Sequence, residues 1–216
     1  FAGDGYRKRE SEPVIYLYGE KKKVLPYLVE GIVREDVKDN RVALTIGNET
    51  KGAFLHGKSY VPGLNYSLKS RLDWLAGLID ADGSLNCKYG TISISSVDKN
   101  FLNDIKLMLN TLGVTGVIGV MHKKSRRLMP THNEEGYKEY ECKESYRITI
   151  NSTNIAKLID LGLVTHRVKL VYNPHPDKSK FITVVSIKEE EGLHNVYCFN
   201  EPKNHTFIAN GCITGN

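Results

Sequence analysis

The stretch "SRLDWLAGLIDADG" (Ser70–Gly83) decides how the rest of the chain is interpreted. Leu75, Leu78 and Ile79 recur at the spacing of one helix face, and Asp82 follows at the end of the same face. A buried helix does not carry a carboxylate on its apolar stripe unless something near its end requires one. The stretch therefore predicts a helix that delivers Asp82 to its C-terminal end.

The ends of this helix also have sequence signals. Ser70 is the expected N-cap, with Asp73 three residues further on, as in a capping box. Gly83 is expected to end the helix. Small side chains between these ends would let another backbone approach closely, and they are Ala76, Gly77 and Ala81.

Composition narrows the possible partners and locations. At 216 residues the chain is long enough for one large or two small domains with cores of their own. The net charge of +5 favours a polyanionic partner. No window has the apolar length of a membrane span, so we expect no membrane partner. The cysteines form no CxxC pair, which disfavours structural zinc and favours a reducing, intracellular location.

A repeat runs through the first two thirds of the chain. Asp4 of "FAGDG" corresponds to Asp82 at an offset of 82 − 4 = 78 residues. The same offset aligns "VIYLYGEKKKV" (residues 14–24) with "ISISSVDKNFL" (residues 92–102) without a gap. Each copy reads as an alternating strand followed by a helix, predicted over residues 21–32 in the first copy and 100–113 in the second.

A later strand recurs as well, because "RVALTIGN" (residues 41–48) resembles "YRITINST" (residues 146–153). The second copy carries an insertion that contains "HKKSRR" (residues 122–127). We predict an α+β protein with two α-β-β-α-β-β-α units, residues 1–65 and 66–165, the first lacking most of its opening helix. The alternative, that two unrelated α/β stretches share these patterns, stays open.

Residues 75–83 read "LAGLIDADG", which resembles without mismatch the signature of the LAGLIDADG homing endonucleases. The resemblance implies two pseudo-twofold units with their signature helices paired at the interface and saddle-shaped sheets in the DNA major groove. It implies that Asp82 and Asp4 bind Mg²⁺ and hydrolyse both strands of a long duplex target. "FAGDG" keeps only the last part of the signature, so the first site matches less completely.

Two strands carry candidate DNA contacts. In "TISISS" and "YRITIN" the polar residues share one face and the isoleucines the other, which suits a sheet that reads a major groove. A solvated sheet face would show the same alternation, and a basic run is often a solvated loop. The predicted contacts are Ser93, Ser95, Arg147, Thr149 and Asn151 on the strands, and Lys123, Lys124 and Arg126 in the basic run.

The ending "VYCFNEPKNHTFIANGCITGN" (residues 196–216) resembles the C-terminal splicing region of inteins. The resemblance implies that Asn216 cyclises through its side-chain amide and cleaves the following peptide bond, with His205 polarising the carbonyl or moving a proton. It predicts that residues 166–216 are an all-β part of a Hint splicing domain. The matching residues are Tyr197, His205, Phe207, Asn210, Gly211 and Asn216.

The splicing pattern is incomplete in two ways. Gly215 stands where inteins usually have His, and Cys198 stands where Asp is common. Cys198 together with Thr214 leaves open a branched thioester route to splicing. That route also needs a Trp in the N-terminal splicing half, whereas the one Trp of this sequence, Trp74, lies in the signature helix. No N-terminal nucleophile is present, so we expect an N-terminal intein fragment and a host protein as partners. A free-standing or degenerate LAGLIDADG DNA-binding protein without splicing is the alternative.

Overall fold

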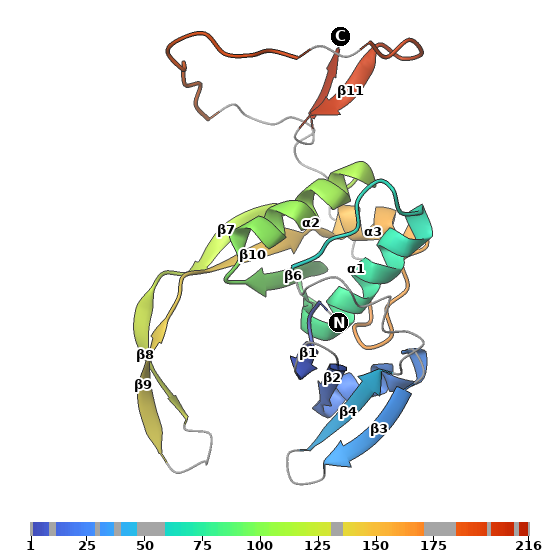
Figure 1. Cartoon of the computed structure of the whole chain (residues 1–216), viewed down its shortest axis with the longest axis vertical. Helices are drawn as coiled ribbons and strands as arrows, with labels where there is room; N and C mark the ends of the chain where they lie inside the picture. The colour runs from blue at the N-terminus through green and yellow to red at the C-terminus, as the bar shows by residue number, and fades with distance from the viewer. Residues whose placement is uncertain are drawn as a thin grey trace. The chain divides into compact units, whose positions relative to one another are not determined.

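The computed structural model describes residues 2–8, 12–28, 31–36, 40–46, 59–130, 136–170, 185–197, 200–209 and 212–215. The chain divides into two units, Phe1–Asn173 and Pro174–Asn216, and we describe each by itself (Figure 1). None of the helices found in the described residues is both long enough and apolar enough to cross a membrane.

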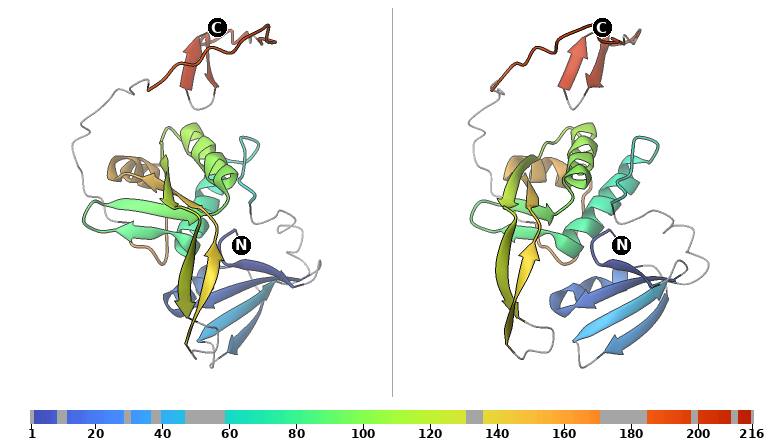
Figure 2. Two further views of the ribbon diagram at one scale, coloured as in Figure 1. Left: turned by 90° about the vertical axis from the view of Figure 1, so that its left-hand side faces the viewer. Right: turned by 60° about the vertical axis from the view of Figure 1, so that its left-hand side comes forward.

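The first unit contains one complete α+β layer structure between residues 68 and 160. Its four strands form an antiparallel sheet in the order β5-β6-β10-β7, and the three helices cover one face of it (Figures 1 and 2). The elements are α1 (Leu68–Asp82), β5 (Ser84–Asn86), β6 (Thr91–Ser96), α2 (Lys99–Thr111), β7 (Val117–His122), β10 (Ser145–Ile150) and α3 (Ser152–Asp160).

The core of this layer structure lies between the sheet and the helices. Strand residues alternate between faces, so the isoleucines of β6 and β10 all point toward the helices and are at most 1% exposed. Their polar neighbours in the sequence point to the opposite face. The most deeply buried side chains of the core, at no more than 1% exposure, are Leu75, Ile79, Ile92, Ile94, Leu102, Ile105, Leu109, Ile148, Ile150, Ile155 and Leu158.

Helix α1 begins one turn earlier than its sequence predicts. The N-cap is Ser67, whose hydroxyl accepts a hydrogen bond from the Ser70 N–H at 3.0 Å, so Ser70 lies inside the helix. The residues that this adds to the helix, 68–70, are exposed, and Leu72 in the following turn is buried at 3% exposure. Gly83 ends the helix as predicted and donates its N–H to the Ile79 carbonyl at 2.8 Å. A Cβ at Gly83 would lie 2.5 Å from that oxygen, which explains the glycine.

The first repeat builds a second sheet with the same strand order. The order β1-β2-β4-β3 corresponds strand for strand to β5-β6-β10-β7, in agreement with the predicted repeat. Its buried residues, including Ile15, Leu17 and Leu44, form a small core of their own. The elements are β1 (Gly5–Lys8), β2 (Glu12–Tyr18), the 3-10 helix η1 (Gly19–Tyr27), β3 (Gly31–Asp36) and β4 (Arg41–Ile46).

The helices of the first repeat differ from the prediction. The segment predicted as a helix over residues 21–32 is a 3-10 helix that ends at Tyr27, and Ile32 already belongs to β3. Pro26 offers no N–H to a regular α-helix, which favours the shorter form. Ala2 to Asp4 form a turn. The predicted closing helix would fall on residues 47–58, which lie outside the described residues.

The insertion in the second repeat is a β-hairpin. Strands β8 (Ser125–Pro130) and β9 (Tyr137–Cys142) follow β7 and precede β10 in the sequence, and they pair with each other in antiparallel orientation. In Figures 1 and 2 the hairpin extends as an arm beyond the sheet. None of its described residues is buried.

The second unit has one two-stranded sheet in its described part. Strands β11 (Thr206–Ala209) and β12 (Cys212–Gly215) pair antiparallel, with Thr206 opposite Gly215. Five of its large apolar side chains are almost fully exposed, at 82–104%: Val185, Ile187, Leu193, Val196 and Tyr197. The described residues of this unit therefore form no hydrophobic core by themselves.

Candidate functional site

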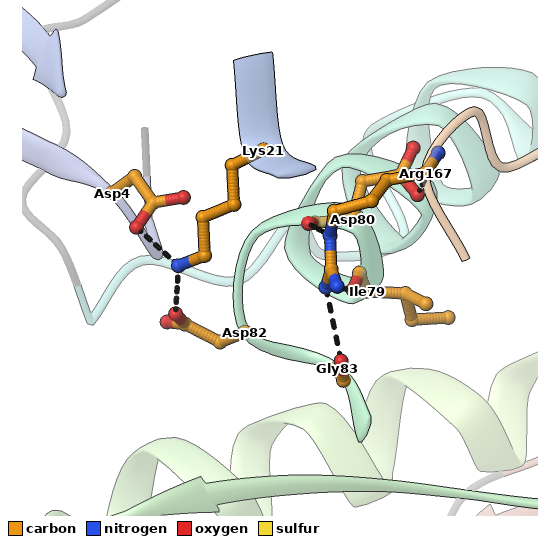
Figure 3. Close-up of polar contacts among 7 residues, drawn as sticks. All are labelled: Asp4, Lys21, Ile79, Asp80, Asp82, Gly83 and Arg167. Carbon is orange, nitrogen blue, oxygen red and sulfur yellow. Dashed lines mark hydrogen bonds and ion pairs between the residues drawn. The ribbon is translucent and has the colours of Figure 1, made fainter. Parts of the chain in front are cut away.

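The two predicted carboxylates of the first unit meet at one lysine. Lys21 of η1 places its Nζ 2.6 Å from Oδ1 of Asp4 and 3.5 Å from Oδ1 of Asp82 (Figure 3). Asp4 comes from the first repeat and Asp82 from the second. The structure thus brings together two residues that are 78 positions apart and belong to equivalent places in the repeat.

Close packing of a turn against a helix end produces this arrangement. Asp82 is the last residue of α1, and Asp4 directly precedes β1, where its carbonyl accepts a hydrogen bond from the Tyr16 N–H at 3.2 Å. A Cβ added at Gly3 would lie 2.4 Å from Cβ of Ala81 and 2.8 Å from Oδ2 of Asp82. Only glycine at position 3 lets the turn approach the helix this closely.

The small residues of α1 are used unequally. Ala81 receives the turn at Gly3, as the small-residue prediction requires. A Cβ built on Gly77 would meet nothing within 4 Å. Gly77 instead lines a cavity of about 350 Å³ between α1 and the first sheet, together with apolar residues such as Leu17 and Val24.

Burial dominates the electrostatics of Asp4. Desolvation raises the pKa of Asp4 above its ordinary value, and the ammonium group of Lys21 opposes that rise. The neighbouring carboxylate of Asp82 adds a smaller upward contribution. Asp4 Oδ2 is buried and has no hydrogen-bond partner among the described residues. The site therefore contains an acceptor oxygen with unused capacity.

The donor set at this point suits a hard divalent cation. Carboxylate oxygens are the ligands that Mg²⁺ prefers, and Mg²⁺ is usually held by one or two carboxylates plus waters and phosphate oxygens. Asp4 and Asp82 supply two carboxylates, one with an unpartnered oxygen. The described residues contain no group of three or more His, Cys, Asp or Glu side chains that could enclose a metal. The site fits an ion that completes its shell with water and substrate.

A polar hollow opens beside Asp82 on the uncovered face of the second sheet. Its volume is about 320 Å³, and its lining includes four of the predicted DNA contacts: Ser93, Ser95, Arg147 and Thr149. These side chains come from the adjacent strands β6 and β10, which pair Ser93 with Thr149 and Ser95 with Arg147. The structure therefore places the predicted sheet contacts next to the predicted carboxylate.

The remaining predicted contacts lie elsewhere. Asn151 is the N-cap of α3, and its side-chain oxygen accepts a hydrogen bond from the Asn154 N–H at 2.9 Å. Its side chain is therefore committed to the helix end. Lys123 and Lys124 are exposed in the connection between β7 and β8. Arg126 lies in β8 with its Nη1 4.0 Å from Glu139 Oε2.

The predicted splicing residues belong to the second unit. His205 precedes β11 in a left-handed conformation with φ 52° and donates its N–H to the Glu201 carbonyl at 3.2 Å. Thr214 lies in β12 opposite Phe207, with Oγ1 buried and no hydrogen-bond partner found among the described residues. Cys198 and Asn216 lie outside the described residues.

Sequence reasoning missed two residues that hold the end of α1. Asp80 is buried and accepts hydrogen bonds from the N–H groups of His166, Arg167 and Val168 at 2.7, 2.9 and 3.0 Å. The guanidinium of Arg167 donates to the carbonyls of Ile79, Asp80 and Gly83 (Figure 3). The sequence did contain one signal for Asp80, because a second carboxylate within an apolar helix needs a partner. Nothing in the sequence connects it to Arg167, 87 residues away.

Comparison with known families finds a match that lies in the second repeat. Residues 70–161 match the family described as LAGLIDADG-like domain. This match covers the α1–α3 layer structure and the hairpin but not the first repeat or the second unit. The α+β layer structure of residues 70–161 is therefore similar to the LAGLIDADG-like domain family.

Curated relatives match the chain along its whole length. The ribonucleoside-diphosphate reductase large subunit of Invertebrate iridescent virus 6 is 34% identical over 219 residues, covering 100% of this chain and 22% of that protein. The ribonucleoside-diphosphate reductase NrdEB subunit alpha of Bacillus subtilis (strain 168) is 27% identical over 262 residues, covering 100% and 24%. The chain thus spans less than a quarter of the length of these relatives.

Solved structures with a similar arrangement include a homing endonuclease. A variant of I-DmoI in complex with its target DNA in the presence of Mg has a TM-score of 0.45 and 17% identity, with 74% of this chain and 86% of that chain covered. Other structures of I-DmoI contain DNA with Mn or with Ca. Full-length DUF199/WhiA from Thermatoga maritima has a TM-score of 0.44 and 14% identity, covering 76% and 52%.

Proposed function

We propose that the first unit, Phe1–Asn173, is a divalent-metal-dependent endonuclease that cleaves both strands of a specific duplex DNA. The observation that carries this proposal is the convergence of Asp4 and Asp82, from the two repeats, on the single ammonium group of Lys21. The LAGLIDADG-like domain at residues 70–161 supports the same assignment.

In this proposal Asp4 and Asp82 hold the metal. The chemistry that a divalent cation would supply there is Lewis-acid polarisation of a phosphate oxygen and activation of water. Lys21 provides a fixed positive charge beside the two carboxylates, where it can stabilise the negative charge that develops on a phosphate during hydrolysis. The partly buried position of Asp4 limits the water that competes for the site.

The sheet face next to Asp82 supplies the DNA contacts of the proposal. Arg147 can donate two hydrogen bonds to a guanine edge, and the hydroxyls of Ser93 and Thr149 can donate or accept. These groups share one hollow with Asp82. Binding of the duplex against this face would therefore bring a phosphate close to the paired carboxylates.

The test is cleavage of a duplex that carries the uninterrupted reductase coding sequence, with Mg²⁺ and with EDTA. We expect the chain, alone or with its N-terminal fragment, to cut this duplex and the Asp82→Asn variant to lose at least about 100-fold in rate. Asp73→Asn is the matched control, because Asp73 lies on the same helix but is exposed and, among the described residues, forms an ion pair with Lys69.

The outcomes separate the candidate functions. Cleavage that is lost in Asp82→Asn and kept in Asp73→Asn supports the nuclease. Specific binding without cleavage by the unsubstituted protein would contradict it and favour the alternative, a degenerate DNA-binding module. Equal cleavage by Asp82→Asn and Asp73→Asn would show that Asp82 takes no part in catalysis.

We further propose that the second unit, Pro174–Asn216, is the C-terminal part of an intein splicing domain inside a ribonucleoside-diphosphate reductase. The full-length match to reductases that are more than four times longer supports an inserted element. The exposed apolar residues of this unit, such as Leu193 and Tyr197, support an N-terminal fragment that completes the domain. At the open end of the β11–β12 pair, the His205 carbonyl lies near Gly215, which directly precedes Asn216 in the sequence.

Splicing is tested by co-expressing the chain, with a short peptide after Asn216, and an N-terminal fragment. We expect mass spectrometry to detect ligated product and released peptide, and Asn216→Ala to abolish both. Asn204→Ala is the control, since Asn204 is an exposed residue of the turn before β11. Absence of ligated product, or equal yields from Asn216→Ala and the unsubstituted chain, would exclude splicing.

A further inference from the structure

The β8–β9 hairpin has two chemically different faces. In an antiparallel pair, residues directly opposite each other project to the same side, and neighbours in the sequence project to opposite sides. The register pairs Arg127 with Tyr140 and Met129 with Lys138. It pairs Arg126 with Glu141 and Leu128 with Glu139. The two adjacent arginines therefore lie on opposite faces of the hairpin.

The charges separate between these faces. The face of Arg127 and Lys138, which we call the basic face, carries two positive charges and no carboxylate in its paired positions; its members are Ser125, Arg127, Met129, Lys138, Tyr140 and Cys142. The opposite face carries Arg126 with two glutamates, Glu139 and Glu141. On that face Arg126 Nη1 lies 4.0 Å from Glu139 Oε2, so a carboxylate stands beside its positive charge.

Arg127 is differently placed. Its Nε donates to Ser125 Oγ at 3.2 Å, a neutral neighbour on the same face. In the part of the chain that the structure describes, Arg127 forms no ion pair with a carboxylate. The hydrogen bond to Ser125 orients the guanidinium and leaves its full positive charge available. Tyr140, 42% exposed, stands opposite Arg127 on this face.

The β8–β9 hairpin is an exposed arm, and its basic face offers positive charges to which a polyanion could bind. Its strands continue from β7 and β10 of the sheet whose polar hollow contains Arg147 and Asp82. We propose that the β8–β9 hairpin contacts the phosphate backbone of duplex DNA through Arg127 and Lys138 on its basic face, while the neighbouring Arg126 makes no contact. This inference rests on the proposed DNA-binding function and places Arg127, instead of the sequence-predicted Arg126, in the interface.

The pair Arg126 and Arg127 provides the experiment, because the two residues share type and strand and differ in the face of the hairpin that they occupy. Binding of fluorescently labelled duplex DNA is measured by anisotropy at several salt concentrations, without divalent metal, for Arg126→Ala and Arg127→Ala. Two duplexes are used, the uninterrupted reductase sequence and a random sequence. Each phosphate contact contributes close to one unit to the slope of log K against log salt concentration.

We expect Arg127→Ala to weaken binding about 5- to 10-fold on both duplexes and to reduce the salt slope by about 1. The double variant Arg127→Ala/Lys138→Ala is expected to reduce the slope by about 2, and Arg127→Lys to restore it. Arg126→Ala should stay within about 2-fold of the unsubstituted chain. Circular dichroism of each variant checks that the exposed hairpin change leaves the fold intact.

The proposal is overturned if Arg126→Ala weakens binding as much as Arg127→Ala, or if both leave the salt slope unchanged on a chain that binds DNA. It is also overturned if the unsubstituted chain binds neither duplex at low salt. That last result removes the proposed DNA function itself, and so it differs from a failure of the hairpin assignment alone.

Discussion

Asp80 and Asp82 stand two residues apart at the end of α1 and have opposite environments. Two residues along a helix turn by about 200°, so the two side chains leave on different sides. Asp80 is 5% exposed and accepts three backbone N–H groups from residues 166–168. The side chain of Asp82 is 41% exposed and meets only Lys21, at 3.5 Å, among its described contacts.

The difference separates a structural carboxylate from an available one. Three charge-assisted hydrogen bonds satisfy Asp80, and Arg167 completes the anchor by covering the helix carbonyls beside it. Asp82 keeps free lone pairs on a rigid helix end. The anchored residue fixes the position from which the available residue acts. The following predictions test this contrast, in order of the expected change in the free energy of unfolding.

Asp80→Ala should cause the largest loss. It leaves three N–H groups of the 166–168 segment without their acceptor, and we expect the free energy of unfolding to fall by about 3 kcal/mol. Urea denaturation followed by circular dichroism measures it. Asp73→Ala is the control on the same helix and should cost at most about 0.5 kcal/mol, because Asp73 is exposed. Equal losses would mean that Asp80 is no anchor.

Arg167→Ala should follow with a loss of about 2 kcal/mol. Its guanidinium donates to three main-chain carbonyls at the C-terminal end of α1, which also carries the negative end of the helix dipole. Arg167→Lys keeps the charge but not the forked geometry and should recover part of the loss. Lys169→Ala, an exposed change in the same segment, should leave stability within about 0.5 kcal/mol.

Asp82→Asn should have little effect on stability and a large effect on DNA cleavage. We expect the free energy of unfolding to change by no more than about 0.5 kcal/mol, because the side chain is partly exposed and has one long contact. Denaturation and DNA cleavage measured on the same sample test both halves of the contrast. A large loss of stability here would show that Asp82 serves the fold in the way that Asp80 does.

Asp4→Asn should have the smallest effect on the free energy of unfolding, and this effect should depend on pH. Burial raises the pKa of Asp4, so the native state holds a proton at this carboxyl more tightly than the unfolded chain does. Its contribution to the free energy of unfolding therefore falls as pH rises from the ordinary value of 3.8 through the raised pKa. Asp4→Asn lacks this carboxyl and should gain stability relative to the unsubstituted chain over that range. A difference that does not vary with pH would contradict the expectation.

Local patterns in the sequence were informative about elements and faces. The alternation in "TISISS" and "YRITIN" correctly separated buried isoleucines from the polar face that lines the hollow beside Asp82. The helix face through Leu75 and Ile79 is buried as its spacing predicts. Patterns of this kind succeed because side-chain direction follows from the backbone period alone.

The misses share a different origin. Ser67 is the N-cap in place of Ser70, and the three residues that this adds to the helix, 68–70, are exposed. The predicted helix after Lys21 shortened to a 3-10 form that contains Pro26. Asn151, predicted to contact DNA, caps α3. In each case the segment is compatible with two local structures, and its residue pattern alone does not decide between them.

By itself, the sequence determined the helix of residues 75–82, the pairing of Asp4 with Asp82 through a 78-residue repeat, and the polar face of the second sheet. Only the tertiary structure decided that Lys21 bridges the two carboxylates, that Arg167 anchors the helix end, and that Arg126 and Arg127 face opposite ways. Spacing along one element is local and periodic, and the chain displays it directly. A contact between residues 60 to 90 positions apart depends on which surfaces pack together, and that is known only when the chain has folded.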